Sequence, residues 1–113
     1  MFVSGHRRQD MRSLRMHEAI AEKLRRDPVP VLAKARANLD RWRDSSTPSR
    51  YLGEWERLLN GPADQLLALL LDESEDAIAL RHASPFAGVL TPQERWDIYR
   101  SFREEWPIAS RPV

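Results

Sequence analysis

Histidines are the side chains of this sequence best suited to acid–base or metal chemistry, and the three of them stand far apart. His6, His17 and His82 form no His-x-x-x-His pair, so no expected helix presents a ready zinc site. His17 falls on the apolar face of an expected helix, where a histidine is more often half-buried and hydrogen-bonded than a ligand or a base. The histidines therefore predict neither a metal centre nor a general base.

Motifs for phosphate binding, nucleophilic catalysis and calcium binding are also missing. The four glycines are isolated, so no loop can close its backbone N–H groups on a phosphate, and no Ser is flanked by glycines as a nucleophile elbow requires. The acidic run Asp72 to Asp76 lacks the mid-loop Gly and the terminal Glu of a calcium loop. Paired glutamates such as Glu104 and Glu105 show no sign of the two different environments that acid–base catalysis needs. We therefore expect no enzyme activity, no cofactor and no metal.

Composition is that of a globular protein. The 113 residues suit a single domain, with 42% hydrophobic and 31% charged residues. The absence of Cys excludes disulfides and fits a reducing compartment. The N-terminus meets charge at Arg7 before any apolar segment develops, and the longest apolar run, Leu66 to Leu71, is too short to cross a bilayer. We expect a soluble, cytoplasmic protein with no membrane segment.

Charge is divided unevenly along the chain, although the net charge is only +1. Residues 1–43 contain 11 Lys and Arg against 5 Asp and Glu, whereas residues 44–113 contain 7 against 12. This division favours either an acidic partner for the first part or contact between the two parts. It also weakens the case for a uniformly basic nucleic-acid binder.

Apolar residues recur at helical spacing along the chain, which predicts an all-α protein. We expect five to six short helices in one small domain, residues 1–113, with 1–9 and 107–113 as loose tails. The first helix is predicted to begin after an N-cap at Asp10 and to end near Arg26. Later helices are expected to begin at Asp27-Pro28, Thr47-Pro48, Pro62, Asp72 with Glu75 as a capping box, and Thr91-Pro92 with Glu94 as a second capping box.

Two groups of apolar side chains on these helices are expected to be buried, either in the core or in an interface. Leu66 to Leu71 is apolar all round, so this helix is either central in the core or part of an interface. The last helix carries aromatic residues at helical spacing, which is more typical of a core face than of a base-stacking platform. These aromatic residues are Trp96, Tyr99, Phe102 and Trp106.

Two other features are unexplained by helix formation. Arg8, Arg12 and Arg15 follow one side of the first helix, where they are either a solvated face or a contact for an acidic partner. The segment Ser84 to Gly88 breaks the helical pattern with a Pro and a Gly around an apolar ring. That ring, Phe86, either plugs a corner between two helices or contacts a partner.

The segment Arg81 to Trp96 resembles a family of short bacterial proteins that are often encoded beside nucleotidyltransferase toxins of the abortive-infection type. It reads Arg-His-Ala-Ser-Pro-Phe-Ala-Gly-Val-Leu-Thr-Pro-Gln-Glu-Arg-Trp. Arg12 to Ala21 and Tyr51 to Trp55 are similar to that family too, so the resemblance spans most of the chain. It implies an antitoxin that binds and silences its neighbouring toxin, an enzyme that modifies RNA ends with nucleotides.

We therefore expect a non-enzymatic protein-binding module, most specifically an antitoxin that inhibits a partner nucleotidyltransferase toxin. The residues expected to contact the partner are Arg8, Arg12, Arg15, Ser84, Pro85, Phe86, Ala87, Gly88, Arg95 and Trp96. The arginines suit the acidic metal-binding residues that such a toxin needs. The alternative is a small DNA-binding regulator that uses the same arginines on phosphates. This alternative is not favoured, because the best-capped late helix is aromatic rather than base-reading.

Overall fold

Six α-helices make up most of residues 5–45 and 50–106, which are the residues that the computed structural model describes. They are α1 (Gly5–Arg26), α2 (Pro28–Asp44), α3 (Arg50–Asn60), α4 (Ala63–Leu71), α5 (Glu75–His82) and α6 (Pro92–Glu105). No strand occurs among these residues, and the prediction of a small all-α domain is confirmed for this part of the chain. No helix within it is long and apolar enough to cross a membrane.

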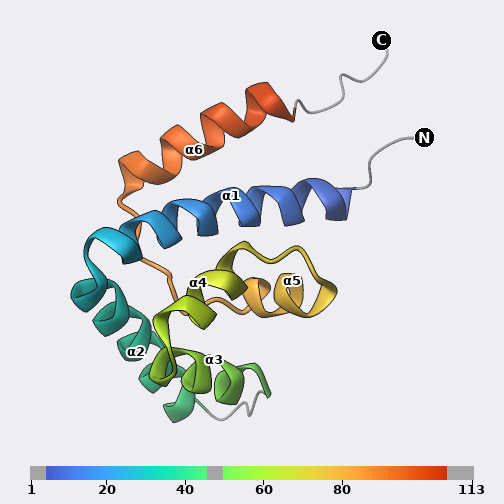
Figure 1. Ribbon diagram of the computed structural model, residues 1–113. Helices are drawn as coiled ribbons and strands as arrows, with labels where there is room; N and C mark the ends of the chain where they lie inside the picture. The colour runs from blue at the N-terminus through green and yellow to red at the C-terminus, as the bar shows by residue number, and fades with distance from the viewer. Residues whose placement is uncertain (1–4, 46–49, 107–113) are drawn as a thin grey trace.

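The long helix α1 runs through the middle of the molecule and contacts α2, α4, α5 and α6 (Figure 1). Helices α4 and α5 lie on one side of α1, while α6 lies along its opposite side (Figure 1). Helix α3 packs against α2 and α4, so α1 to α5 enclose a common core. Among the helices of the described residues, α1 is the one with which α6 makes extensive contact. Helix α1 therefore has two different faces, one towards the core and one towards α6.

The core between α1 and α5 is apolar and centres on two aromatic rings. Trp55 is fully buried and meets the ring of Phe86 edge-on, with 5.7 Å between the ring centroids. Its indole Nε1 donates a hydrogen bond to the carbonyl oxygen of Leu80 at 3.1 Å, which satisfies the one polar atom of the side chain. The aliphatic residues around these rings are Ile20, Ala21, Leu24, Val31, Ala35, Leu39, Leu58, Leu59, Leu66, Leu70, Leu80, Val89 and Leu90.

The all-apolar helix α4 belongs mainly to this core. Leu66 and Leu70 are buried, and Leu67 and Leu69 are half-buried. Leu71, at its C-terminal end, remains 37% exposed. The buried side chain of Arg81 donates hydrogen bonds to the carbonyl groups at this end of the helix. Its Nη1 reaches the carbonyl oxygens of Leu69 at 3.1 Å and of Asp72 at 2.5 Å, and burial lowers the pKa of this side chain.

The start of α1 differs from the prediction. The helix begins at Gly5, so residues 5–9 are helical rather than part of a loose tail, and Asp10 lies inside the helix rather than at its N-cap. The physical reason is tertiary contact, because Arg8 Nε donates to the carbonyl oxygen of Trp106 at 3.1 Å across the molecule. Residues 1–4 and 107–113, the remainder of the two expected tails, lie outside the described residues.

Of the two predicted capping boxes, one is confirmed and one is wrong. Thr91 Oγ1 accepts from the backbone N–H of Glu94 at 3.1 Å, while the Glu94 carboxylate accepts from the backbone N–H of Thr91 at 2.8 Å. Helix α5 is instead capped by Ser74, whose Oγ accepts from the backbone N–H of Ala77. Asp72 lies two residues before this N-cap, and its carboxylate accepts hydrogen bonds from the backbone N–H and the hydroxyl of Ser74. The predicted start at Thr47-Pro48 lies outside the described residues.

The uneven charge along the chain produces ion pairs between its two parts. Arg15 lies 2.5 Å from Glu105, and Lys23 lies 2.7 Å from Glu94, so two ion pairs join α1 to α6. Arg43 of α2 pairs in the same way with a glutamate of α3. Contact between the basic and the acidic part, one of the two alternatives for this pattern, is thus present in the fold.

Candidate functional site

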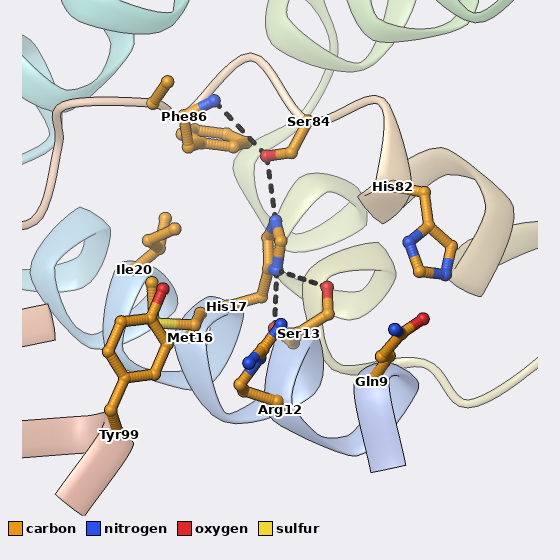
Figure 2. A pocket seen from close by; sticks show the side chains of 11 residues that line it. Gln9, Arg12, Ser13, Met16, His17, Ile20, His82, Ser84, Phe86 and Tyr99 are labelled. Atoms are coloured by element: carbon orange, nitrogen blue, oxygen red, sulfur yellow. Dashed lines mark hydrogen bonds between the residues drawn. The ribbon is translucent and has the colours of Figure 1, made fainter. Parts of the chain in front are cut away.

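A pocket of about 370 Å³ lies between the first half of α1, the segment 84–87 and α6 (Figure 2). It brings together residues that the sequence analysis expected to bind a partner but that lie far apart in the chain. Arg12 comes from the basic row, and Ser84, Phe86 and Ala87 come from the unusual segment. Tyr99 of α6 completes the wall opposite the segment. We call this the loop pocket.

His17 lies at the centre of the loop pocket and joins α1 to the segment (Figure 2). Its Nδ1 is 2.7 Å from the carbonyl oxygen of Ser13, and its Nε2 is 2.8 Å from Ser84 Oγ. A carbonyl oxygen only accepts, so Nδ1 carries the proton and Nε2 accepts from the Ser84 hydroxyl. This is the hydrogen-bond order of a serine nucleophile and its histidine base.

The electrostatic surroundings of His17 do not suit it to act as a base. Burial, together with the smaller effects of the nearby Arg81 and His82, lowers its pKa to about 4. In a catalytic triad, a carboxylate orients the histidine. Here the neutral backbone carbonyl of Ser13 takes that position. Formation of an imidazolium is therefore unfavourable at neutral pH. We interpret the bond between Ser84 and His17 as a structural tie, and the expectation of a buried, hydrogen-bonded histidine is confirmed.

Phe86 belongs to the core rather than to an open surface. Its ring is 2% exposed and lies edge-on to both Trp55, at 5.7 Å, and His17, at 6.4 Å. Pro85 is also fully buried. Of the two alternatives for Phe86, the structure supports the plug between helices. The expected partner contacts of Pro85 and Phe86 are corrected accordingly, because both side chains are buried and Phe86 only borders the loop pocket.

Ala87 and Gly88 are the exposed part of the same segment. Gly88 has a φ of +84°, which is a backbone conformation that residues with a Cβ rarely adopt. A Cβ at this position would also lie 2.8 Å from Lys34 Cε. The glycine is therefore required by the turn, and Ala87 is the side chain of this segment that a partner can reach.

Asn38 of α2 fixes this segment, and the sequence analysis missed it. Its buried Nδ2 donates to the carbonyl oxygens of Pro85 at 2.7 Å and of Ala87 at 2.9 Å, while Arg41 donates to its Oδ1. The available signal was its position three residues after Ala35 on the buried face of α2, where an amide needs a partner. Spacing alone could not identify that partner.

The basic row of α1 faces α6. The guanidinium of Arg8 lies 5.0 Å from the ring centroid of Phe102, and that of Arg12 lies 5.5 Å from the ring centroid of Tyr99. Arg15 is paired with Glu105. The row is therefore neither a freely solvated face nor wholly available to a partner, because it holds α6 in place. Arg12 nevertheless remains exposed.

Arg95 and Trp96 lie on an outer face of α6, away from the loop pocket. Both are exposed, and the Trp96 side chain is 57% exposed. The expectation that the aromatic residues of this helix form one core face is therefore wrong for Trp96. Phe102 is buried, whereas Tyr99 and Trp106 are half-buried. The physical reason is that α6 packs on one helix only, so a narrow stripe of its surface is covered.

The described residues contain no group of three or more His, Asp or Glu side chains that could hold a metal ion. No protein-family model, curated protein or solved structure matches this chain. The fold and the site together define a small all-α protein whose loop 84–90 is clamped onto α1 and α2 beside an open pocket.

Proposed function

We propose that the protein is a non-enzymatic protein-binding module, and specifically an antitoxin that binds and inhibits a partner nucleotidyltransferase toxin. The observation that carries this proposal is the loop pocket, in which exposed Arg12 and exposed Ala87 line one site. The resemblance of Arg81 to Trp96 to antitoxin-like proteins supplies the kind of partner.

The lining of the loop pocket supports a protein partner. Met16, Ile20 and Tyr99 provide an apolar side, whereas Gln9 and His82 provide a polar one (Figure 2). A mixed pocket of this kind suits a partner side chain with an apolar body and a polar end.

Arg12 adds a charge that an acidic partner can use. It forms no ion pair within the described residues. A nucleotidyltransferase holds its catalytic metal ions with carboxylates, which are natural contacts for a guanidinium. When a toxin binds at the loop pocket, Arg12 is therefore placed to cover the acidic metal-binding site of that toxin.

A DNA-binding role is less well supported. Reading DNA bases requires a helix whose polar face is open to the major groove. The arginine row of α1 is instead covered in part by α6, through Phe102, Glu105 and the carbonyl of Trp106.

Co-expression with the nucleotidyltransferase encoded beside its gene, followed by size-exclusion chromatography, tests the proposal. We expect the two proteins to elute together. Ala87→Arg fills the loop pocket with a larger side chain, and Arg12→Glu reverses the charge at its edge. Each variant should therefore weaken the complex about tenfold or more. Separate elution of the unmodified proteins at micromolar concentration would contradict the proposal.

Arg26→Glu is the matched control for Arg12→Glu. It makes the same charge change on the same helix, at an exposed position of the opposite end, and should leave the affinity unchanged. Simultaneous replacement of Arg8 and Arg15 is a poor test, because both side chains contact α6 and their loss would loosen that helix as well as remove partner contacts. Circular dichroism of each variant verifies that the helices are retained.

A further inference from the structure

A second cleft, of about 330 Å³, lies on the seam between α1 and α6. Its lining consists of Arg8, Arg12, Tyr99, Phe102 and Arg103. Three arginines thus line one small space, and no acidic residue does. We call this the arginine cleft. It meets the loop pocket at Arg12 and Tyr99, which line both.

The guanidiniums of the arginine cleft are not neutralised by the fold. Within residues 5–45 and 50–106, none of Arg8, Arg12 and Arg103 forms an ion pair, whereas Arg15 on the same helix is paired with both Glu18 and Glu105. Three positive charges around one space repel each other, and an anion placed between them removes that repulsion. The cleft is therefore electrostatically prepared for a negative ligand.

Two of the three arginines are also held in position before any ligand arrives. Arg8 lies against the ring of Phe102 and donates from Nε to the carbonyl oxygen of Trp106. Arg12 lies against the ring of Tyr99. A guanidinium that contacts an aromatic ring keeps N–H groups for hydrogen bonds to an oxyanion. Four residues, or about 6 Å of helix rise, separate these two arginines along α1.

We propose that the arginine cleft binds a phosphate group, with Arg8 and Arg12 on one side and Arg103 on the other. A phosphate offers more oxygen atoms than a carboxylate and carries up to two negative charges, which matches three guanidiniums better. The same chemistry is found in a terminal phosphate monoester and in an internal phosphodiester of single-stranded nucleic acid. The inference does not depend on the proposed antitoxin role.

Titration at low salt, followed by NMR or calorimetry, tests the site. Three probes are used on the full chain: tripolyphosphate, adenosine monophosphate and a single-stranded oligonucleotide with a 5′-hydroxyl end. We expect tripolyphosphate to bind and to shift the side-chain signals of Arg8 and Arg12. Binding of adenosine monophosphate identifies a terminal phosphate as the natural group, whereas binding of the oligonucleotide alone identifies an internal one.

Arg103→Ala is the decisive variant, because the Arg103 side chain forms no hydrogen bond or ion pair within the described residues and its loss leaves the seam intact. It should weaken tripolyphosphate binding about tenfold or more, as expected for a charge-assisted hydrogen bond. Arg26→Ala, at the far end of α1, should have no effect. The proposal is overturned if none of the probes binds at millimolar concentration, or if Arg26→Ala and Arg103→Ala weaken binding equally.

Discussion

The two faces of α1 are held by different forces. Towards α2 to α5, α1 buries Ile20, Ala21 and Leu24 in an apolar core. Towards α6, it presents arginines to aromatic rings and forms two ion pairs. The hydrophobic effect that dominates the first face is insensitive to charge, whereas the second face depends on groups that salt screens. The contact between this second face and α6 is the seam.

Because of this difference, we expect the core formed by α1 to α5 to be more stable than the attachment of α6. The core buries two large aromatic rings, Trp55 and Phe86, together with many aliphatic side chains. In the seam Phe102 is the large apolar side chain that is fully buried. Elements with few buried apolar contacts open with lower free energy than the core, so α6 is expected to open before α1 to α5 unfold.

Phe86→Ala is expected to have the largest effect, because it empties a site between Trp55 and His17 in the core. The free energy of unfolding, measured in urea, should fall by roughly 3 to 5 kcal/mol. Trp96→Ala removes a larger but exposed side chain from α6, and it should change the free energy of unfolding by less than about 0.5 kcal/mol. Similar losses for both variants would show that Phe86 does not act as a buried core plug.

Acid should weaken the core before it weakens the seam. The unfolded chain protonates His17 at its ordinary pKa of 6.5, whereas burial in the folded protein lowers this pKa to about 4. Stability therefore falls as the pH drops from 6.5 to 4, by up to about 3 kcal/mol. Urea unfolding at a series of pH values measures this loss, and His17→Gln should remove the slope.

Glu94 provides the comparison from the seam. The hydrogen bonds from Lys23 and from the backbone of Thr91 lower its pKa to about 2 from an ordinary 4.5. Its contribution is present above pH 4.5 and is lost as the pH falls towards 2. Glu94→Gln should therefore leave the slope between pH 6.5 and 4.5 unchanged. A changed slope there would mean that His17 does not cause it.

Asn38→Ala should have an intermediate effect, because it leaves the carbonyl oxygens of Pro85 and Ala87 without their buried donor. We expect a loss of about 2 kcal/mol in the free energy of unfolding. The backbone N–H of Val89, which donates to the carbonyl of Phe86, should exchange with solvent faster. Asn60→Ala, at an exposed position, is the control and should behave as the unmodified protein.

Salt should have the smallest effect and should act more on the seam than on the apolar core. Raising the ionic strength from about 0.1 M to about 1 M shortens the screening length from about 10 Å to about 3 Å. Exposed pairs such as Arg15 with Glu105 contribute about 0.2 to 1 kcal/mol each, so amide exchange in α6 should accelerate a few-fold. Amides of α4 serve as the internal control, and equal acceleration there would argue against a separate opening of α6.

Interactions within a few residues were largely predictable. Thr91 and Glu94 form the expected capping box because both partners lie within one helical turn. The same rule failed for Asp72, because Ser74 is a competing cap two residues later and spacing alone does not rank the two. Most of the core could likewise be predicted from periodicity, whereas the exposure of Trp96 could not, because it depends on how many helices cover α6.

The sequence by itself determined that this protein is helical, where most of its helices end and which faces they bury, because those properties arise from contacts within about four residues. Tertiary structure alone decided which distant residues the polar side chains bind. The bond between His17 and Ser84 joins residues 67 positions apart, and that between Arg15 and Glu105 joins residues 90 apart. A chain pattern with a period of 3.6 residues contains no information about such partners. The loop pocket and the arginine cleft exist only because folding brings α1, the segment after α5 and α6 together.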